Sequence, residues 1–197
     1  MFEGLVFKVA DPAERERALA LRRRIYSAEL GTEGIDEYDE RADHLIACGE
    51  SGELIAAVRV VRPDDRPFEC ERYVDLGDFL PENRRPAEAS RFCVDPAHRL
   101  LNQDNVVQIG ILKILVWFAE SQEATDVVTL VMPHLKNFYR VVFFQRLGDP
   151  IRHAVFGTAH FLRLDLGELR ERGGRRGNSL ARLLLEPDLP NFRLELP

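Results

Sequence analysis

Hydrophobic and polar positions divide the first part of the chain into a strand followed by a helix. Phe2–Ala10 alternates as a strand does, and Asp11 and Pro12 then supply a helix N-cap and a proline at the first helical position. Ala13–Leu30 carries apolar residues at helical spacing with charges between them. The pattern therefore predicts an amphipathic helix that ends at Gly31.

The next part of the chain predicts a loop, a hairpin and a long connection. The acidic stretch Thr32–Arg41 has no apolar period and is expected to be a surface loop. Two β-branched runs, His44–Cys48 and Leu54–Val61, are separated by a glycine-containing tetrapeptide and predict a β-hairpin. Pro63–Pro86 is a connection of the length that often forms lids or partner surfaces.

The remaining pattern alternates strands with helices. It predicts a strand at Ala87–Val94, an apolar helix at Asn105–Glu120, a buried strand at Asp126–Met132, a helix from Pro133 to about Gln145, a strand at Ala154–Leu164 and a short helix at Leu180–Leu185 after a glycine-rich turn. The proline-rich tail 186–197 is expected to lie as an arm on the body. Since helices, strands and a hairpin are all present, we expect one α/β domain of residues 1–197 with a mixed sheet.

Composition narrows the class of protein. The chain has 197 residues, 45% of them hydrophobic, which is enough for one well-filled core. The balance of 27 basic against 33 acidic residues gives a net charge of −6 and argues against a nucleic-acid partner. The longest apolar run, Ile109–Ala119, is too short for a membrane span. Without a signal-peptide pattern or paired cysteines, a cytoplasmic protein is expected.

Acidic residues concentrate in the segment Asp36-Glu37-Tyr38-Asp39, just before the predicted hairpin. Two or three carboxylates within four residues can collect the positive charge of an amine substrate, or hold an arginine by bidentate pairing. A solvated acidic loop has the same composition, because runs of charge usually lie on the surface.

Charged residues also fall within predicted strands. Alternate residues of a strand share a face, so Glu88 and Arg91 point to opposite faces and pair only if a bulge intervenes. Arg59 lies in a β-branched run, where an arginine needs an acidic partner. Asp36, Asp39 and Glu88 are the candidate partners. Together with Arg22 they predict a buried charged network, for which a purely structural role is the alternative.

Several common catalytic patterns are missing. The five histidines show no HxxxH or HExxH spacing, so no metal site is expected. The chain has no Gly-x-Ser-x-Gly elbow, no GxGxxG and no Walker-type loop. The predicted helix at Asn105 also lacks a preceding glycine-rich turn, which weakens coenzyme A as the donor.

The charged residues resemble, in order and spacing, those of the acyl-homoserine-lactone (autoinducer) synthases and the related long-chain N-acyl amino acid synthases. The shared pattern is Arg22-x-x-x-Tyr26, Asp36-x-x-Asp39, Arg59, Phe79 and Glu88-x-x-Arg91. It spans roughly Arg22 to Asp95, with a looser likeness at Leu147–Pro150, and the Glu-x-Ser-Arg-Phe stretch is its most specific piece. The resemblance implies a GNAT-like acyltransferase fold, with a central mixed sheet flanked by helices.

The resemblance also implies roles for individual residues. It assigns Glu88 and Arg91 to catalysis, with Glu88 accepting the proton of the attacking amine. It places the substrate among Arg22, Tyr26, Asp36, Asp39, Arg59 and Phe79. Thr32 stands where the signal synthases usually have tryptophan, which favours an amino acid or another small amine over S-adenosylmethionine as acceptor. The implied donor is the phosphopantetheine thioester of an acyl carrier protein, with acyl-CoA as the alternative and no bound cofactor.

Basic residues gather in the last third of the chain. Between Lys136 and Arg176 there are nine basic and four acidic residues, a local charge of +5 in a chain of −6. An acyl carrier protein is strongly acidic, so Arg140, Arg146 and Arg175 are candidate docking residues. Ordinary solvated arginines are the alternative. Two other functions stay open: an acetyl-CoA-dependent N-acetyltransferase of the GNAT type, and a non-catalytic GNAT-like module that binds an acylated ligand.

Overall fold

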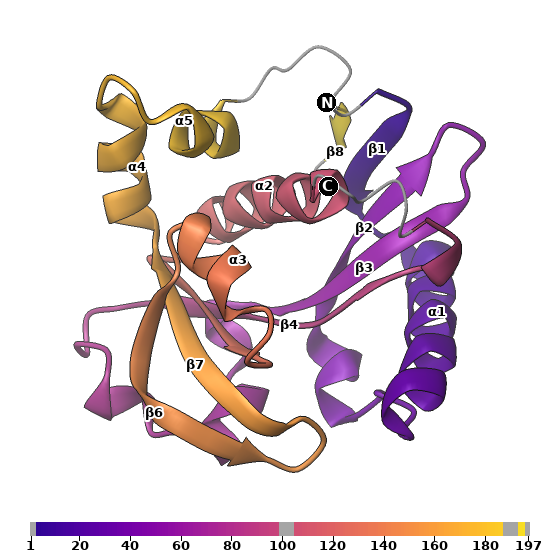
Figure 1. Ribbon diagram of the computed structural model, residues 1–197, viewed down its shortest axis with the longest axis horizontal. Coiled ribbons are helices and arrows are strands. Elements are labelled where there is room, and N and C mark those ends of the chain that lie inside the picture. Colours follow the sequence, from indigo (N-terminus) through magenta and orange to yellow (C-terminus); the bar gives the residue numbers. More distant parts are fainter. Residues whose placement is uncertain (1–2, 99–104, 187–192, 196–197) are drawn as a thin grey trace.

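The computed structural model describes residues 3–98, 105–186 and 193–195, and within them one sheet of eight strands runs through the molecule (Figure 1). The strand order is β6-β7-β5-β4-β3-β2-β1-β8. The strands are β1 (Leu5–Val9), β2 (Asp43–Gly49), β3 (Leu54–Val61), β4 (Pro86–Val94), β5 (Asp126–Val131), β6 (Gln145–His153), β7 (Gly157–Asp165) and β8 (Arg193–Glu195). Neighbouring strands pair antiparallel except β4 with β5 and β1 with β8, so the sheet is mixed as expected.

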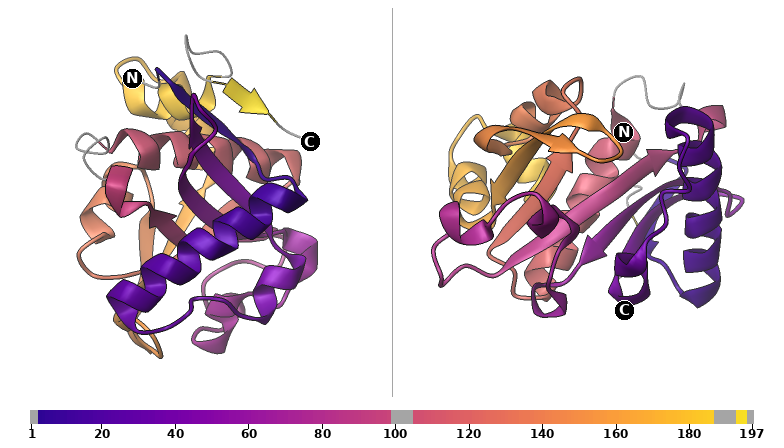
Figure 2. Two further views of the ribbon diagram at one scale, coloured as in Figure 1. Left: turned by 90° about the vertical axis from the view of Figure 1, so that its right-hand side faces the viewer. Right: turned by 90° about the horizontal axis from the view of Figure 1, so that it is seen from below.

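Helices cover both faces of this sheet. They are α1 (Pro12–Leu30), α2 (Val106–Ser121), α3 (Lys136–Val141), α4 (Leu166–Gly174) and α5 (Ser179–Leu185). The left view of Figure 2 shows α1 and α2 on opposite sides of the strands between them. On β2, Leu45 belongs to the cluster around α2, whereas Ile46 belongs to the cluster around α1. Successive strand residues point to opposite faces, so this alternation divides the core into two layers.

Local sequence signals set the ends of α1. The Asp11 side chain accepts the backbone N–H of Glu14 (2.8 Å), and the Glu14 side chain accepts the N–H of Asp11 (3.1 Å), which forms a capping box. Gly31 closes the helix with φ +67°, a conformation that glycine adopts without a Cβ clash. The predicted helix and its two ends are confirmed.

The segment expected to be a surface loop, Thr32–Arg41, is partly buried. Its second half forms the 3₁₀ helix η1 (Glu37–Arg41), in which Tyr38 and Asp39 are buried. The expectation of a surface loop was wrong because the charges of this segment are paired with arginines from the sheet and from α1 rather than with solvent. The long connection to β4 likewise contains three short 3₁₀ helices, of which η3 (Glu69–Arg72) includes the buried Glu69.

The region after β5 departs furthest from the sequence prediction. The helix expected from Pro133 to about Gln145 is only α3, and Gln145 begins the edge strand β6. This strand was missed because most of its side chains are exposed and it carries no apolar alternation. It is also interrupted by a register shift between Leu147 and Ile151. The helix α4 was missed as well, and the strand expected from Ala154 begins at Gly157.

Only part of the predicted C-terminal arm lies within the described residues. Arg193–Glu195 forms β8 and extends the sheet by pairing in parallel with β1. The rest of the predicted tail, 187–192 and 196–197, lies outside the described residues. Among the helices that are described, none is long and apolar enough to cross a membrane.

We expect Gly110→Ala to destabilise the fold, although alanine favours helices over glycine by about 1 kcal/mol. A Cβ at Gly110 of α2 would lie 2.0 Å from Cζ of Phe7, which is fully buried on β1. Overpacking of this kind costs about 1–3 kcal/mol, and urea unfolding measures it. Gly174→Ala is the matched control, because nothing lies within 4 Å of its Cβ. Equal stability of the two variants would contradict this packing of β1 against α2.

Candidate active site

A cavity opens where two central strands separate. The parallel strands β4 and β5 pair only from Pro86 with Asp126 to Glu88 with Val128. Beyond this point the two strands diverge, and a cavity of about 890 Å³, part of it open to solvent, lies between them and under α2 and α3. Glu88 thus stands at the apex of the gap, on the last residue pair that holds the strands together.

The cavity passes from one face of the sheet to the other. Ala89 and Val131 in its lining belong to the α2 core cluster, whereas Glu88 pairs with Val128, which belongs to the cluster on the opposite face. The α2 side is lined by apolar and aromatic residues: Ile111, Leu112, Leu115, Leu135, Phe138, Tyr139 and Phe144. The other side is lined by polar and aromatic residues: Tyr26, Glu69, Glu88, Ser90, Arg91, His153 and Phe156. One space therefore joins an apolar chamber to a set of ionisable groups.

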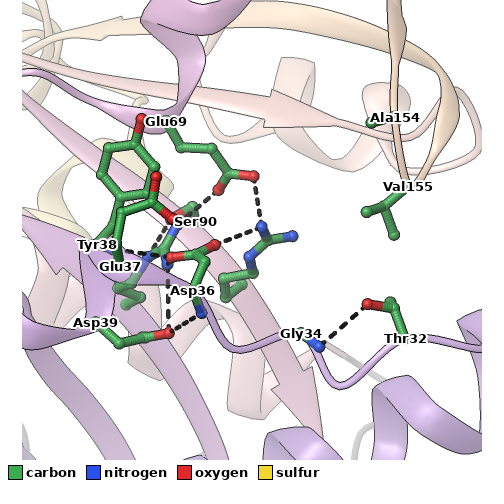
Figure 3. Close-up of polar contacts among 12 residues, drawn as sticks. Thr32, Gly34, Asp36, Glu37, Tyr38, Asp39, Glu69, Ser90, Ala154 and Val155 are labelled. Carbon is green, nitrogen blue, oxygen red and sulfur yellow. Dashed lines mark hydrogen bonds and ion pairs between the residues drawn. The ribbon is translucent and has the colours of Figure 1, made fainter.

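Two arginines and two carboxylates form a closed ring of ion pairs at the polar side (Figure 3). Arg59 pairs with Asp36 and, through Nη2, with Oε2 of Glu69 at 2.6 Å. Arg91 Nη2 pairs with the other oxygen of each carboxylate, at 2.7 Å from Asp36 Oδ2 and 2.5 Å from Glu69 Oε1. Each charge is thereby neutralised by two partners, which buried charges require.

A bulge in β4 places Arg91 in this ring. The pairing of β3 with β4 shifts between Ala57 and Arg59, so two residues of β4 lie opposite one residue of β3, and Arg91 has φ +58°. The bulge turns Arg91 toward the face of Glu88. In a regular strand these two side chains would point to opposite faces. Arg91 also lies between two rings, 5.9 Å from the centre of Tyr26 and 5.8 Å from the centre of Phe156.

A second buried pair ties the acidic segment to α1. Arg22 and Asp39 are both almost fully buried and form an ion pair, and Nε2 of His44 lies 3.3 Å from Asp39 Oδ1. Burial opposes ionisation of Asp39, but the His44 contact and the charges of Arg22 and Arg59 hold the pKa of Asp39 below its ordinary value. Asp39 also accepts the backbone N–H of Asp36 at 3.0 Å. This pair therefore positions Asp36 for the ring.

Glu88 is buried beside the ring without an arginine in contact. Its two oxygens accept the backbone N–H groups of Glu69 (3.0 Å) and Cys70 (2.7 Å). Burial, and then the negative charge of Glu69, raise the pKa of Glu88 to about 7. Each carboxylate oxygen keeps a further lone pair. Glu88 is thus a carboxylate in the cavity wall that changes protonation near neutral pH.

Two residues of this site were not predicted from the sequence. Glu69 lies in the long connection, in the run Glu-Cys-Glu-Arg, where nothing distinguishes it from the neighbouring acidic residue. His153 ends β6 and faces Glu69, with Nε2 3.5 Å from Oε1. Burial acts against ionisation of Glu69, yet His153, Arg91 and Arg59 lower its pKa from the ordinary value. The one sequence signal that pointed toward Glu69 was the need of Arg59 for an acidic partner. Asp36, Asp39 and Glu88 were the predicted partners, and Glu69 was not among them.

The remaining predicted residues lie in different places. Tyr26 lines the cavity, and burial raises its pKa. Phe79 is not among the lining residues. Its ring packs edge-on against Phe161, with centroids 5.6 Å apart, in the cluster that contains Val128. The three arginines proposed for docking, Arg140 in α3, Arg146 in β6 and Arg175 after α4, are all exposed. Of the three, only Arg140 directly follows a residue that lines the cavity, Tyr139 of α3.

Two loops far apart in the sequence lie beside the ion-pair ring. Figure 3 shows Thr32 and Gly34 facing Ala154 and Val155 of the β6–β7 turn. A Cβ at Gly34 would lie 2.5 Å from an aromatic carbon of Tyr26, so only glycine lets this loop pass so close to the tyrosine side chain. Among the described residues, no group of three or more histidine, cysteine or acidic side chains is arranged to hold a metal ion.

Solved structures of low sequence identity share this fold. The N-acyl amino acid synthase FeeM from uncultured soil microbes superposes with a TM-score of 0.71 at 19% identity, over 85% of this chain and 93% of that chain. The CoA-dependent acyl-homoserine lactone synthase BjaI, solved with SAM and isopentyl-CoA, gives 0.68 at 16% identity, over 98% and 95%. TofI in its apo form gives 0.65 at 19% identity, over 91% and 94%. The GNAT-like fold is thereby confirmed.

Sequence comparison identifies the family. The comparison with curated proteins found no match. Residues 17–165 match the family model of the N-acyl amino acid synthase FeeM, and this range includes the ion-pair ring, Glu88 and His153. Since the match covers more than half of the chain, the chain belongs to the FeeM family of N-acyl amino acid synthases, which are acyltransferases.

Proposed function

We propose that this protein joins a fatty acyl group, delivered as the thioester of an acyl carrier protein, to the amine of a small acceptor, with an amino acid as the favoured class. One observation supports the proposal above all: the cavity connects an apolar chamber to a buried carboxylate across the gap between β4 and β5. An acyl chain and a nitrogen nucleophile need these two environments side by side. The apolar and aromatic lining of the chamber also suits an alkyl chain.

The chemistry assigns a proton acceptor to the polar side. The nitrogen attacks the carbonyl carbon, the C–N bond forms, the C–S bond breaks, and the thiolate leaves as a thiol after taking up a proton. The attacking nitrogen must lose a proton, which Glu88 accepts directly or through water. A positioned base of this kind contributes about 10²–10⁴-fold. Its pKa near neutrality suits this role better than that of an ordinary glutamate.

The acceptor is proposed to bind on the polar side of the cavity, between Gly34 and the β6–β7 turn. The ion-pair ring lies beside this place, and Nη1 of Arg91 has no hydrogen-bond partner among the described residues, so a carboxylate of the acceptor finds a guanidinium N–H group there. TofI has been solved with MTA and BjaI with SAM, so S-adenosylmethionine is the second acceptor to test. Release of methylthioadenosine marks that reaction, whereas mass spectrometry of the product identifies an N-acyl amino acid.

The donor is proposed to dock over α3 and the end of α4. Arg172 of α4 lies 5.8 Å from the ring of Phe143, so the basic end of α4 is held beside the α3–β6 connection. The exposed arginines of this region then face an acidic carrier whose thioester enters the adjacent chamber. BjaI is described as CoA-dependent, so acyl-CoA of the same chain length is the competing donor.

Glu88→Gln is expected to lower kcat by about 10²–10⁴-fold at saturating donor, because the amide cannot accept the proton. Product formation from acyl carrier protein thioesters and a mixture of amines, followed by mass spectrometry, measures the loss. Glu120→Gln serves as the control, since Glu120 is on the far end of α2 and pairs with Arg170. A rate near that of the wild type in Glu88→Gln would remove Glu88 from the mechanism.

The wild-type rate is expected to fall below pH 7. Glu88 acts as a base only when deprotonated, and its pKa is raised to about 7, so kcat/KM loses about tenfold per pH unit on the acid side. Protonation of the acceptor amine also lowers the rate on the acid side, and this part of the pH profile is the same in wild type and Glu88→Gln. Comparing pH profiles of the two proteins isolates the Glu88 limb. A wild-type profile without this additional limb would contradict the assignment.

Reversing the charge of Arg140, Arg146 or Arg175 to glutamate is expected to raise KM for the carrier-bound donor and leave kcat unchanged. The effect should shrink as salt is added, because exposed charges are screened within about 10 Å at 0.1 M ionic strength. Arg23→Glu on α1 is the matched control, since Arg23 is also exposed and lies on an element outside the proposed docking region. Unaltered donor kinetics in all three variants would place docking elsewhere.

A further inference from the structure

His153 is the one polar side chain that crosses the gap from the β6–β7 hairpin to the charged cluster. Its ring is almost fully buried and lines the cavity. It stacks on Phe156, with centroids 4.3 Å apart and planes 12° apart, and lies 4.6 Å from the ring of Tyr73. Contacts with two aromatic rings thus restrict the orientation of the His153 ring.

The turn that follows β6 fixes the tautomer of His153. Its Nδ1 accepts the backbone N–H groups of Val155 (3.1 Å) and Phe156 (3.1 Å). A nitrogen that accepts two N–H groups carries no proton, so the proton of the neutral ring is on Nε2. Nε2 lies 3.5 Å from Oε1 of Glu69 without meeting the geometry of a hydrogen bond. Because Nδ1 accepts the N–H groups of the turn and Nε2 carries the proton, this ring is not a proton acceptor for the substrate.

Glu69 connects His153 to Glu88. The carboxylate of Glu69 belongs to the ion-pair ring, and its backbone N–H is one of the two groups bound to Glu88. The segment η3 therefore does two things to Glu88: it excludes water from it, and it brings a negative charge near it. Both raise the pKa of Glu88, and they outweigh the two backbone hydrogen bonds that lower it.

We infer that His153 is a positioning residue, whose Nε2–H group holds the Glu69 carboxylate across the gap and so keeps η3 seated on Glu88. The inference rests on the proposed function, in which Glu88 is the base. The contact of 3.5 Å is longer than an ordinary hydrogen bond, so it acts as an electrostatic contact between the Nε2–H group and the carboxylate. No other donor on the β6–β7 hairpin is in contact with Glu69 among the described residues.

Loss of this contact has a definite sign for Glu88. The groups that face Glu69 are Arg59 from β3, Arg91 and Glu88 from β4, Tyr26 from α1, Asp36 before η1 and His153 from β6. If η3 loosens, Glu88 gains water and loses the nearby charge of Glu69, so its pKa falls from about 7 toward the ordinary value of a glutamate. A weaker base at the same place then gives a slower reaction, with its acid limb at lower pH.

Two substitutions separate this role from a purely structural one. In His153→Asn the side-chain oxygen lies near the position of Nδ1, so it keeps the bonds of the turn but does not reach Glu69. In His153→Gln the amide nitrogen lies near the position of Nε2, so it keeps the donor to Glu69. A residue that only shapes the turn is replaced better by asparagine, whereas a residue that positions Glu69 is replaced better by glutamine.

The decisive measurement is the titration of the Glu88 carboxyl carbon by NMR in the resting protein, assigned with Glu88→Gln. We expect wild type and His153→Gln to titrate near pH 7, and His153→Asn to titrate about one unit or more lower. In the acylation assay, His153→Asn should lose about tenfold to a hundredfold in kcat with its acid limb moved to lower pH, and His153→Gln should lose less. Thermal unfolding checks that both variants are folded.

The outcomes are distinct. Unshifted titration in His153→Asn, equal shifts in both variants, or a shift in His153→Gln alone would each overturn the inference. Because the titration needs no turnover, it tests His153 even where the acylation assay fails. A wild-type protein that titrates as expected but acylates no amine contradicts the proposed function and leaves the coupling between His153 and Glu88 standing.

Discussion

The ring of ion pairs between Asp36, Glu69, Arg59 and Arg91 is the interaction on which the rest of the site depends. Its members come from a loop after α1, a connection before β4, and the two strands β3 and β4. Removing one partner of a buried pair costs about 3–5 kcal/mol, because the remaining charge is stranded away from water. Here each charge has two partners, so the loss of one member leaves two others incompletely paired.

The separation of β4 from β5 leaves a cavity beside this ring. A sheet that stayed paired along its whole length would bury Glu88 against β5 and leave no space for a ligand. The strands diverge directly after Glu88, and the bulge at Arg91 begins three residues later on the same strand. β4 thus carries the proposed base on the last residue that pairs with β5 and a cation in the bulge that follows, and both contact Glu69.

The sequence predicted those parts of the fold that follow from local chemistry. The capping box and Gly31 define α1, and alternation with a glycine-rich turn defines the hairpin of β2 and β3. The edge strand β6 was not predicted, because a strand with mostly exposed side chains has no alternation of apolar and polar residues. The bulge at Arg91 was foreseen only as a condition, because the conformation of a strand arginine depends on partners that the local sequence does not contain.

The same reasoning explains which site residues escaped prediction. The charge of Arg59 required acidic partners, and Asp36 was found because it lies in a dense acidic run. Glu69 has no such run to mark it, and its importance comes from a backbone N–H that binds Glu88 and a carboxylate that binds two arginines. His153 is harder still, because the register of an edge strand and the geometry of the turn after it decide where its ring points.

A carboxylate needs opposite conditions for structure and for catalysis, and this site separates them by partner. Glu69 and Asp36 are each paired with two guanidinium groups, which keep them ionised. Glu88 accepts two neutral backbone N–H groups and contacts no guanidinium group among the described residues, so it is oriented without being locked into the charged form. Burial and the charge of Glu69 then raise the proton affinity of Glu88, so a carboxylate that is itself held ionised helps to set the strength of the proposed base.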